Sequence, residues 1–215
     1  MATRNLTIAT MAVLLILAMG TLAAQGAVEY MEENPGSTAV LGGSEAAVTS
    51  PASLEEGILL MREEEKLARD VYLAMYEKWG IKTFANIARS EQQHMDAVAL
   101  LLKSKGMDDP VANAAVGEFT NPKIAALYDE LIALGNTSAI DALTVGAIIE
   151  DLDIYDLQEL LAETDDADTV RVYSALLRGS ENHMRSFAGL LNRFGKPYEA
   201  QYISSERLTE ILTGR

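Results

Sequence analysis

The chain of 215 residues carries a formal net charge of −15 and has a sequence pI of about 4.5, which argues against nucleic acid or an anionic membrane surface as a partner. It contains no cysteine, so disulfide bonds, thiolate metal sites and cysteine nucleophiles are excluded, and any metal ion must be held by carboxylates and imidazoles. Apolar residues make up 49% of the sequence and aromatic residues only 6%, a mixture that favours helices over a β-sandwich or barrel.

The first 26 residues have the pattern of a secretory signal peptide or a membrane anchor. Arg4 is followed by an apolar run from Ile8 to Ala24, and small residues before Ala27 offer a cleavage site. The rival interpretation is an anchor formed by residues 6–24, because the run is at the lower edge of the length that spans a bilayer. Both interpretations predict an exported protein, extracellular or in the cell envelope, with residues 27–52 as a flexible linker.

The first long helix of the domain is predicted to begin at Ser53, a capping-box residue, and to end at Gly80. Glu65 is the only charged member of its apolar row, in which residues are spaced three and four apart. Glu64 lies in a flanking apolar row and is the alternative inward-facing carboxylate, while Glu63 is expected on the solvated side. The row is Ile58, Met61, Glu65, Ala68, Tyr72, Met75 and Trp79.

The second predicted helix covers about residues 83–105, stops at Gly106, and is antiparallel to the first because the link between them is short. Its row contains Glu91 and His94, which lie about one turn apart on the same side of the helix. A buried carboxylate without a partner is costly, so this pair needs a cation or hydrogen-bonding neighbours. The row is Phe84, Ile87, Glu91, His94, Val98 and Leu101.

A long connection follows the second helix. Residues 107–121 have no helical period, and Asn121 before Pro122 predicts the start of a shorter helix over about 122–134 that ends at Gly135. We expect this connection to cross the end or the side of a helical bundle.

Two further long helices are predicted after this connection. The third begins near Thr137 or Ser138, and its row is Leu143, Ala147, Glu150, Ile154, Leu157 and Leu161. An Asp-rich turn at 164–166 separates it from the fourth, whose row is Tyr173, Leu176, Ser180, His183, Phe187, Leu190 and Phe194. Residues 196–215 are expected to form a tail with one short helix after Ser204 or Ser205.

Each of the four long helices carries polar residues near the middle of an otherwise apolar row. Both histidines of the chain, His94 and His183, occupy corresponding places in the second and fourth helices, so the two helix pairs form a weak internal repeat. The pattern predicts an all-α four-helix bundle over residues 53–195. A bundle with one Glu from each of two helices and Glu-x-x-His from each of the other two builds a dimetal carboxylate site. Alternatively these are ordinary core or partly solvated residues, with His183 bonded to Ser180 or Glu150.

The same residues carry a resemblance to a known family. The row Glu65-Lys66-Leu67-Ala68-Arg69-Asp70-Val71-Tyr72, followed by Glu91-Gln92-Gln93-His94, resembles the first half of rubrerythrin-type ferritin-like proteins. Residues 54–195 resemble an uncharacterised prokaryotic ferritin-like family. The resemblance implies a ferritin-like four-helix bundle with a long crossover, carrying the short helix, between its second and third helices. It implies metal-ligand roles for Glu65, Glu91, His94, Glu150 and His183, with Tyr72 beside the site as a catalytic or a packing residue.

The sequence departs from that pattern at Ser180, where a complete site would have a fourth carboxylate. Glu181 is adjacent but lies about 100° around the helix, so it reaches the site only after a local bulge or rotation. Three carboxylates leave one positive charge on two divalent ions, which added hydroxide or an oxo bridge would balance; otherwise the second ion binds weakly or is absent. The cysteine-rich rubredoxin-like module of full rubrerythrins, and with it their electron supply, is missing.

These observations lead to two functional expectations. The first is an exported metal-binding protein with a non-haem di-iron or, second, di-manganese site that oxidises ferrous iron or reduces oxygen or peroxide. A binding-only role in metal handling fits the same residues. The second is a structural or interaction bundle of the cell envelope, with a degenerate or single-metal site and no catalysis. Assembly as a homodimer is a further expectation.

Overall fold

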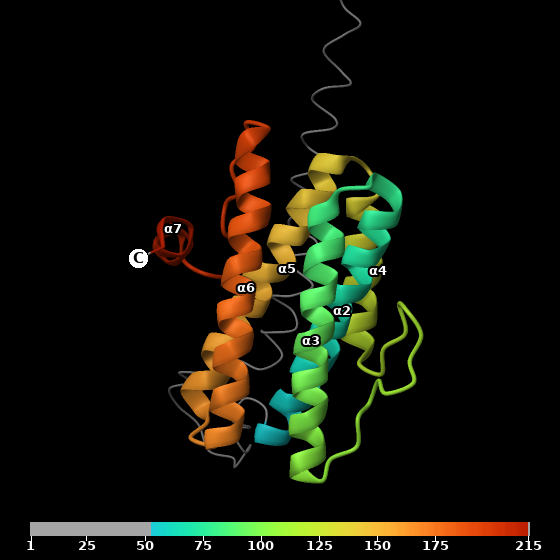
Figure 1. The fold of residues 1–215 in the computed structure, drawn as a ribbon, viewed down its shortest axis with the longest axis vertical. Coiled ribbons are helices and arrows are strands. Elements are labelled where there is room, and N and C mark those ends of the chain that lie inside the picture. The colour runs from blue at the N-terminus through green and yellow to red at the C-terminus, as the bar shows by residue number, and fades with distance from the viewer. Residues whose placement is uncertain (1–52, 215) are drawn as a thin grey trace, which may run out of the picture. The chain divides into compact units, whose positions relative to one another are not determined.

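The computed structural model describes residues 53–214, which form six helices and contain no strand (Figure 1). The predicted signal or anchor segment at 1–26 and the predicted linker at 27–52 lie outside the described residues. None of the described helices is long and apolar enough to cross a membrane. The helices are α2 (Leu54–Trp79), α3 (Lys82–Lys105), α4 (Pro122–Gly135), α5 (Ala139–Glu163), α6 (Ala167–Arg193) and α7 (Ser205–Thr213).

Local sequence signals define the helix boundaries. Ser53 and Glu56 form the expected capping box at the start of α2, each accepting a hydrogen bond from the backbone N–H of the other. Gly80 and Gly106 end α2 and α3 with φ of 67° and 71°, a left-handed conformation that costs glycine nothing because it has no Cβ. The six helices predicted for residues 53–214 are therefore confirmed. The side chains that cap α4, α5, α6 and α7 are Asn121, Ser138, Asp166 and Ser204.

The four long helices pack as a helical bundle made of two pairs. α2 packs mainly on α3 and α5 mainly on α6, and the pairs meet where α3 contacts α6 and α2 contacts α5. The apolar rows predicted from the sequence face this interior along most of their length. Phe194 is an exception and is 60% exposed, because α6 ends at Arg193 and the buried side of its last turn is Leu191.

The middle of α5 is buried on nearly all sides. α2, α4 and α6 each pack against this helix. The C-terminal tail covers a further face, because Asp151 of α5 accepts hydrogen bonds from the Tyr198 hydroxyl and from the backbone N–H groups of Gln201, Tyr202 and Ile203. The tail is thus packed on the bundle through a fully buried carboxylate.

The connection between α3 and α4 covers the outer side of α2. Glu63 accepts hydrogen bonds from the hydroxyl and backbone N–H of Thr120 and from the backbone N–H of Asn121. Lys66 Nζ donates to the Ala115 carbonyl at 2.7 Å. The expectation that Glu63 is solvated is therefore wrong, because a segment without helical period lies over it and leaves it 4% exposed. The crossover runs along the side of the bundle.

Candidate metal centre

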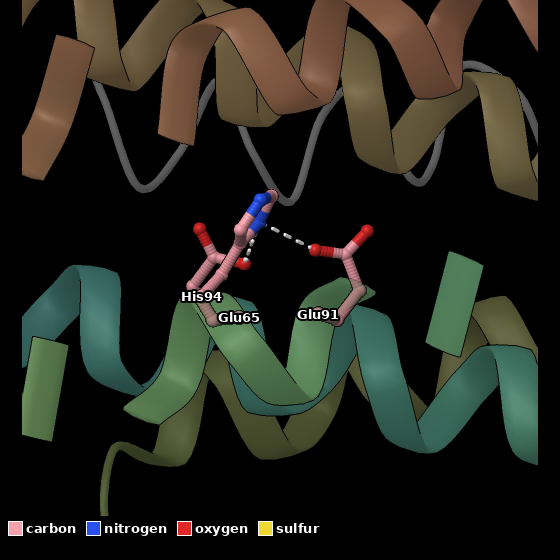
Figure 2. A group of neighbouring side chains, drawn as sticks. All are labelled: Glu65, Glu91 and His94. Atoms are coloured by element: carbon pink, nitrogen blue, oxygen red, sulfur yellow. Dashed lines mark hydrogen bonds and ion pairs between the residues drawn. The ribbon is translucent and has the colours of Figure 1, made fainter. Parts of the chain in front are cut away.

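Two groups of side chains, contributed by four helices, meet inside the bundle. The first group is Glu65 of α2 with Glu91 and His94 of α3 (Figure 2), and the second is Glu91 with Glu150 of α5 and His183 of α6. Within each group the atoms able to bind a metal lie within 4.8 Å of one another. Glu91 belongs to both groups. The five residues predicted as ligands are thus brought together, and metal binding by them stays a prediction.

The first group is organised around the His94 imidazole. His94 Nδ1 lies 3.1 Å from Glu65 Oε2 and 2.8 Å from Glu91 Oε2 (Figure 2). The other edge of the ring lies against α6 at Gly179, where a Cβ atom would come within 2.5 Å of His94 Nε2. Gly179 therefore provides the space that the ring occupies.

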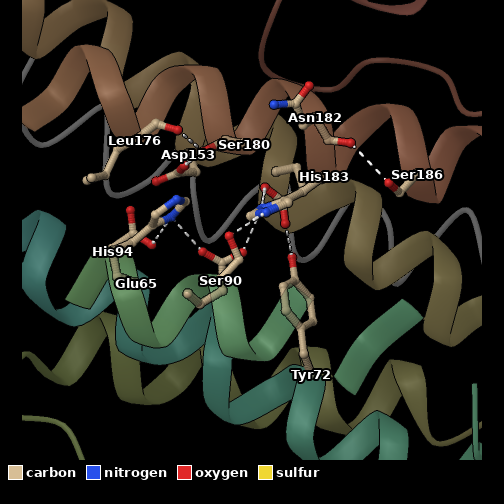
Figure 3. Close-up of polar contacts among 12 residues, drawn as sticks. Glu65, Tyr72, Ser90, His94, Asp153, Leu176, Ser180, Asn182, His183 and Ser186 are labelled. Carbon is tan, nitrogen blue, oxygen red and sulfur yellow. Dashed lines mark hydrogen bonds and ion pairs between the residues drawn. The ribbon is translucent and has the colours of Figure 1, made fainter. Parts of the chain in front are cut away.

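The second group is organised around His183. Its Nδ1 atom lies 2.8 Å from Glu91 Oε1 and 3.5 Å from Glu150 Oε2 (Figure 3). Its Nε2 atom is 3.0 Å from Ser90 Oγ, so the hydroxyl of Ser90 faces the nitrogen that points away from the carboxylates. The Tyr72 hydroxyl donates to Glu150 Oε1 at 2.5 Å. Such outer contacts fix the orientation of metal-binding side chains.

Electrostatic attraction between imidazoles and carboxylates links the two groups. The imidazole rings stack with centroids 5.5 Å apart, and both Nδ1 atoms face Glu91. Burial opposes ionisation of Glu91, but the close polar contacts and charges of His183 and His94 outweigh it and lower the pKa of Glu91 to about 2. Burial is likewise outweighed at the histidines, where the neighbouring carboxylates raise the pKa of His94 to about 11 and that of His183 to about 10.

Several ligand atoms remain without a hydrogen-bond partner. The buried atoms without a hydrogen-bond partner include Glu65 Oε1, Glu91 Oε1 and His183 Nδ1. Glu91 Oε1 and His183 Nδ1 are close enough for an ion pair, but their geometry does not satisfy the angle of a hydrogen bond. Burial also raises the pKa values of Glu65 and Glu150. Buried carboxylates and imidazoles that converge with unpartnered atoms form an arrangement in which a cation can take the place of protons. The residues present therefore fit a metal ion.

The structure also distinguishes the alternatives left open by the sequence. Glu65, not Glu64, joins the ligand group, and Glu64 lies beside Asp156, where burial and that carboxylate raise the pKa of Glu64 well above its usual range. Glu181 forms an ion pair with Arg207 of α7 and points away from the site.

Three residues near the site were not predicted from the sequence: Ser90, Asp153 and Gly179. Ser90 and Gly179 immediately precede Glu91 and Ser180, so they lie off the rows that periodicity identifies. Asp153 lies three residues after Glu150, a spacing that could have found it. It lines a small cavity whose walls also include the apolar side chains of Leu127 and Leu131 from α4. The acidic residues that line the cavity are Glu64, Glu65, Glu91, Glu150 and Asp153.

Comparison with known proteins identifies the family. Residues 55–215 match the model of DUF2202, described as an uncharacterized protein domain. The chain is 53% identical over 159 residues to the uncharacterized protein MJ0754 of Methanocaldococcus jannaschii, which covers 74% of this chain and 86% of the relative. The crystal structure of hypothetical protein MJ0754 from Methanococcus jannaschii is similar with a TM-score of 0.74 and 48% identity, over 81% of this chain and 98% of that one. The chain therefore belongs to the DUF2202 family.

Proposed function

We propose that the protein is a ferritin-like metalloprotein that binds two divalent metal ions between α2, α3, α5 and α6. The observation that carries the proposal is that Glu91 is shared by two ligand groups, each with its own histidine and its own second carboxylate. A carboxylate whose two oxygens face two different imidazoles is suited to bridging a pair of cations, as in dimetal carboxylate bundles.

The ligand set favours iron, with manganese second. Both groups offer carboxylate oxygen and imidazole nitrogen, and the chain has no cysteine that would add a soft sulfur ligand. Five ligands shared between two ions leave coordination positions for small molecules. Bound iron would supply electron transfer to oxygen or peroxide at those positions.

The proposed reaction is the oxidation of ferrous iron or the reduction of oxygen or peroxide. With ferrous iron as substrate, two ions give the two electrons that, together with two protons, convert one hydrogen peroxide into two water molecules. The chain's own part is to hold the ligands and exclude bulk water. Tyr72 and Phe187 do this on one side, with fully buried rings whose centroids are 5.2 Å apart, and Tyr72 also holds Glu150 through its hydroxyl.

We also propose that residues 1–26 direct export or anchor the protein to the cell envelope. The support is the apolar run of residues 8–24 in the sequence. Fractionation of cells and sequencing of the N-terminus of the mature protein test this, since an N-terminus at Ala27 indicates cleavage and an intact chain in the membrane fraction indicates an anchor. An intact chain found only in the cytoplasm would refute it.

Metal content tests the main proposal directly. Protein purified without a metal-affinity tag, and loaded anaerobically with Fe²⁺ or Mn²⁺, should hold two ions per chain by elemental analysis. Glu91→Ala should remove both ions because it belongs to both groups, whereas Glu65→Ala should weaken only the first. Glu181→Ala is the matched control, because this glutamate pairs with Arg207 outside the site.

Failure to retain either ion would reject the metalloprotein and favour the structural bundle. The reaction is tested on the loaded protein by following ferric iron formation in absorbance after addition of peroxide or oxygen. If the loaded protein binds ferrous iron without oxidising it, the proposed reaction is rejected and a binding role in metal handling is retained.

A further inference from the structure

The pair formed by α5 and α6 lacks a carboxylate at the position that corresponds to Glu91 in the pair formed by α2 and α3. Glu91 lies three residues before His94 on α3, and Ser180 lies three residues before His183 on α6. Ser180 is 1% exposed and faces the same interior, but its side chain ends one atom beyond Cβ. A carboxylate at this place would extend further into the site, so the serine leaves space there.

Asp153 of α5 fills this space. The Ser180 hydroxyl donates to Asp153 Oδ2, and Figure 3 shows the carboxylate between Ser180 and the His94 ring. Asp153 lies three residues after Glu150, which puts the two carboxylates about one turn apart on the same side of α5. The Asp153 side chain also lines the cavity that Glu65, Glu91 and Glu150 line.

Charge balance calls for a fourth carboxylate at the site. Glu65, Glu91 and Glu150 together supply three negative charges, which leaves one positive charge on two divalent ions. An uncompensated charge in the bundle interior is costly because the low-dielectric surroundings solvate it poorly. Asp153 is 9% exposed and offers a fourth negative charge from the lining of the same cavity.

We propose that Asp153 is the fourth carboxylate of the metal centre and that it replaces, from α5, the ligand that α6 lacks at Ser180. Ser180 is then a positioning residue: its hydroxyl holds Oδ2, and Oδ1 is the atom assigned to the ion. The inference rests on the proposed function, because it concerns the same two-ion site. It goes beyond the two ligand groups, neither of which contains Asp153.

The test compares Asp153→Asn with Asp156→Asn. Both are buried aspartates on α5, one turn apart, but Asp156 lies beside Glu64 and does not line the cavity. Metal-free proteins are titrated with Mn²⁺, which avoids redox chemistry, and the number of bound ions and their affinities are measured by calorimetry. Wild type and D156N should bind two ions, whereas D153N should bind one normally and the other about tenfold or more weakly.

A charge-relocation variant separates loss of a ligand from loss of packing. The double substitution D153S/S180E returns the carboxylate to α6 and keeps the number of charges constant. It should restore the second ion, whereas D153S alone should not. Circular dichroism of each metal-free variant verifies that the helices have formed.

The outcomes separate this inference from the proposed function. If wild type binds two Mn²⁺ ions and D153N does the same with unchanged affinity, Asp153 is not a ligand, while the metalloprotein proposal stands. If wild type binds neither Mn²⁺ nor Fe²⁺, the proposed function fails and this inference fails with it. If D153N loses an ion but folded D153S/S180E does not regain it, the claim that Asp153 takes the place of a carboxylate missing at position 180 is refuted.

Discussion

At the scale of single residues, the candidate centre depends on side chains that do not themselves contribute ligand atoms. His183 presents Nδ1 to the carboxylates while Ser90 faces its Nε2 atom. The His94 ring is supported instead by the backbone of α6 at Gly179. The two imidazoles thus present the same nitrogen to Glu91, but the far edge of each ring has a different neighbour: the Ser90 hydroxyl at His183 and the backbone of α6 at His94.

Replacing Gly179 with alanine should displace His94. The added Cβ would lie 2.5 Å from two ring atoms of His94, so the ring or the helix must move. We expect a loss of stability of about 1–3 kcal/mol and a weaker first ion. Urea unfolding and Mn²⁺ titration measure the two effects.

Gly189→Ala on the same helix is the matched control for that substitution. No other side chain or distant backbone atom lies within 4 Å of its added Cβ, so the better helix propensity of alanine should stabilise the protein by up to about 1 kcal/mol. Equal effects of the two substitutions would show that His94 does not depend on the space at Gly179.

Removing the Ser90 hydroxyl should loosen the orientation of His183. We expect Ser90→Ala to reduce the affinity for the second ion about 10- to 100-fold, because an outer partner fixes the ligand's ring and tautomer. Mn²⁺ titration measures the change. Ser104→Ala, on the same helix, removes a hydroxyl that bonds only to the Leu101 carbonyl and should leave both ions unaffected. An unchanged S90A protein would mean that packing alone orients His183.

At the scale of elements, local signals predicted every described helix, and periodicity predicted which side of each faces inward. Both signals are local: Ser53 forms its capping box with Glu56 three residues away, and Glu91 and His94 lie within one turn. The two residues that were not placed correctly from the sequence, Glu63 and Asp153, have other reasons. Glu63 is covered by residues 120–121, which have no period. Asp153 lies three residues after Glu150, but the row of α5 also continues four residues on to Ile154, so spacing alone does not choose between the two positions. A single row per helix cannot reveal contacts made by the other faces.

The attachment of the C-terminal tail to α5 should depend on Asp151. This carboxylate accepts hydrogen bonds from the Tyr198 hydroxyl and from three successive backbone N–H groups beginning at Gln201. Asp151→Ala leaves these donors unpaired, and we expect a loss of about 2 kcal/mol or more in free energy of unfolding. Denaturation curves measure the loss, and faster hydrogen exchange at residues 201–203 locates it.

An exposed aspartate provides the comparison for Asp151. Asp168 on α6 forms an ion pair with Arg171, with side chains 55% and 74% exposed, so Asp168→Ala should change stability by less than about 0.5 kcal/mol. Similar losses in both variants would show that the tail contributes little to the stability of α5.

At the scale of the whole molecule, an acidic chain places several of its carboxylates in the interior. Burial raises the pKa values of Asp153 and Asp156 to about 7, whereas those of free aspartates lie near 4. Neighbouring carboxylates also hold both histidines protonated in the metal-free protein. The metal-free fold therefore retains protons that the unfolded chain releases.

The stability of the metal-free protein should fall as the pH rises. Asp153 and Asp156 favour the folded state most below about pH 4, and this contribution is lost as the pH approaches 7. The contribution of His94 and His183 is complete below about pH 6.5 and is lost as the pH rises toward their raised pKa values of about 11 and 10. Both groups act in the same direction, so thermal unfolding in chelator should show a higher Tm near pH 5 than near pH 8.

Bound metal should reduce or reverse this trend, because ions compete with protons for the same atoms. The measurement is a pair of Tm series, one in chelator and one with Mn²⁺. A metal-free Tm that increases from pH 5 to pH 8 would contradict the protonation states described for the buried groups.

The covered turn of α2 has a thermodynamic consequence for ion capture. Glu63 and Lys66 flank Glu65 in sequence and are tied by hydrogen bonds to Thr120 and Ala115. The conformational entropy of this turn is therefore lost when the chain folds, before an ion arrives. A preorganised carboxylate needs no further ordering on binding, which increases affinity. In the proposed metal centre, residues 107–121 would therefore raise the affinity for an ion by ordering this turn, although none of them belongs to either ligand group.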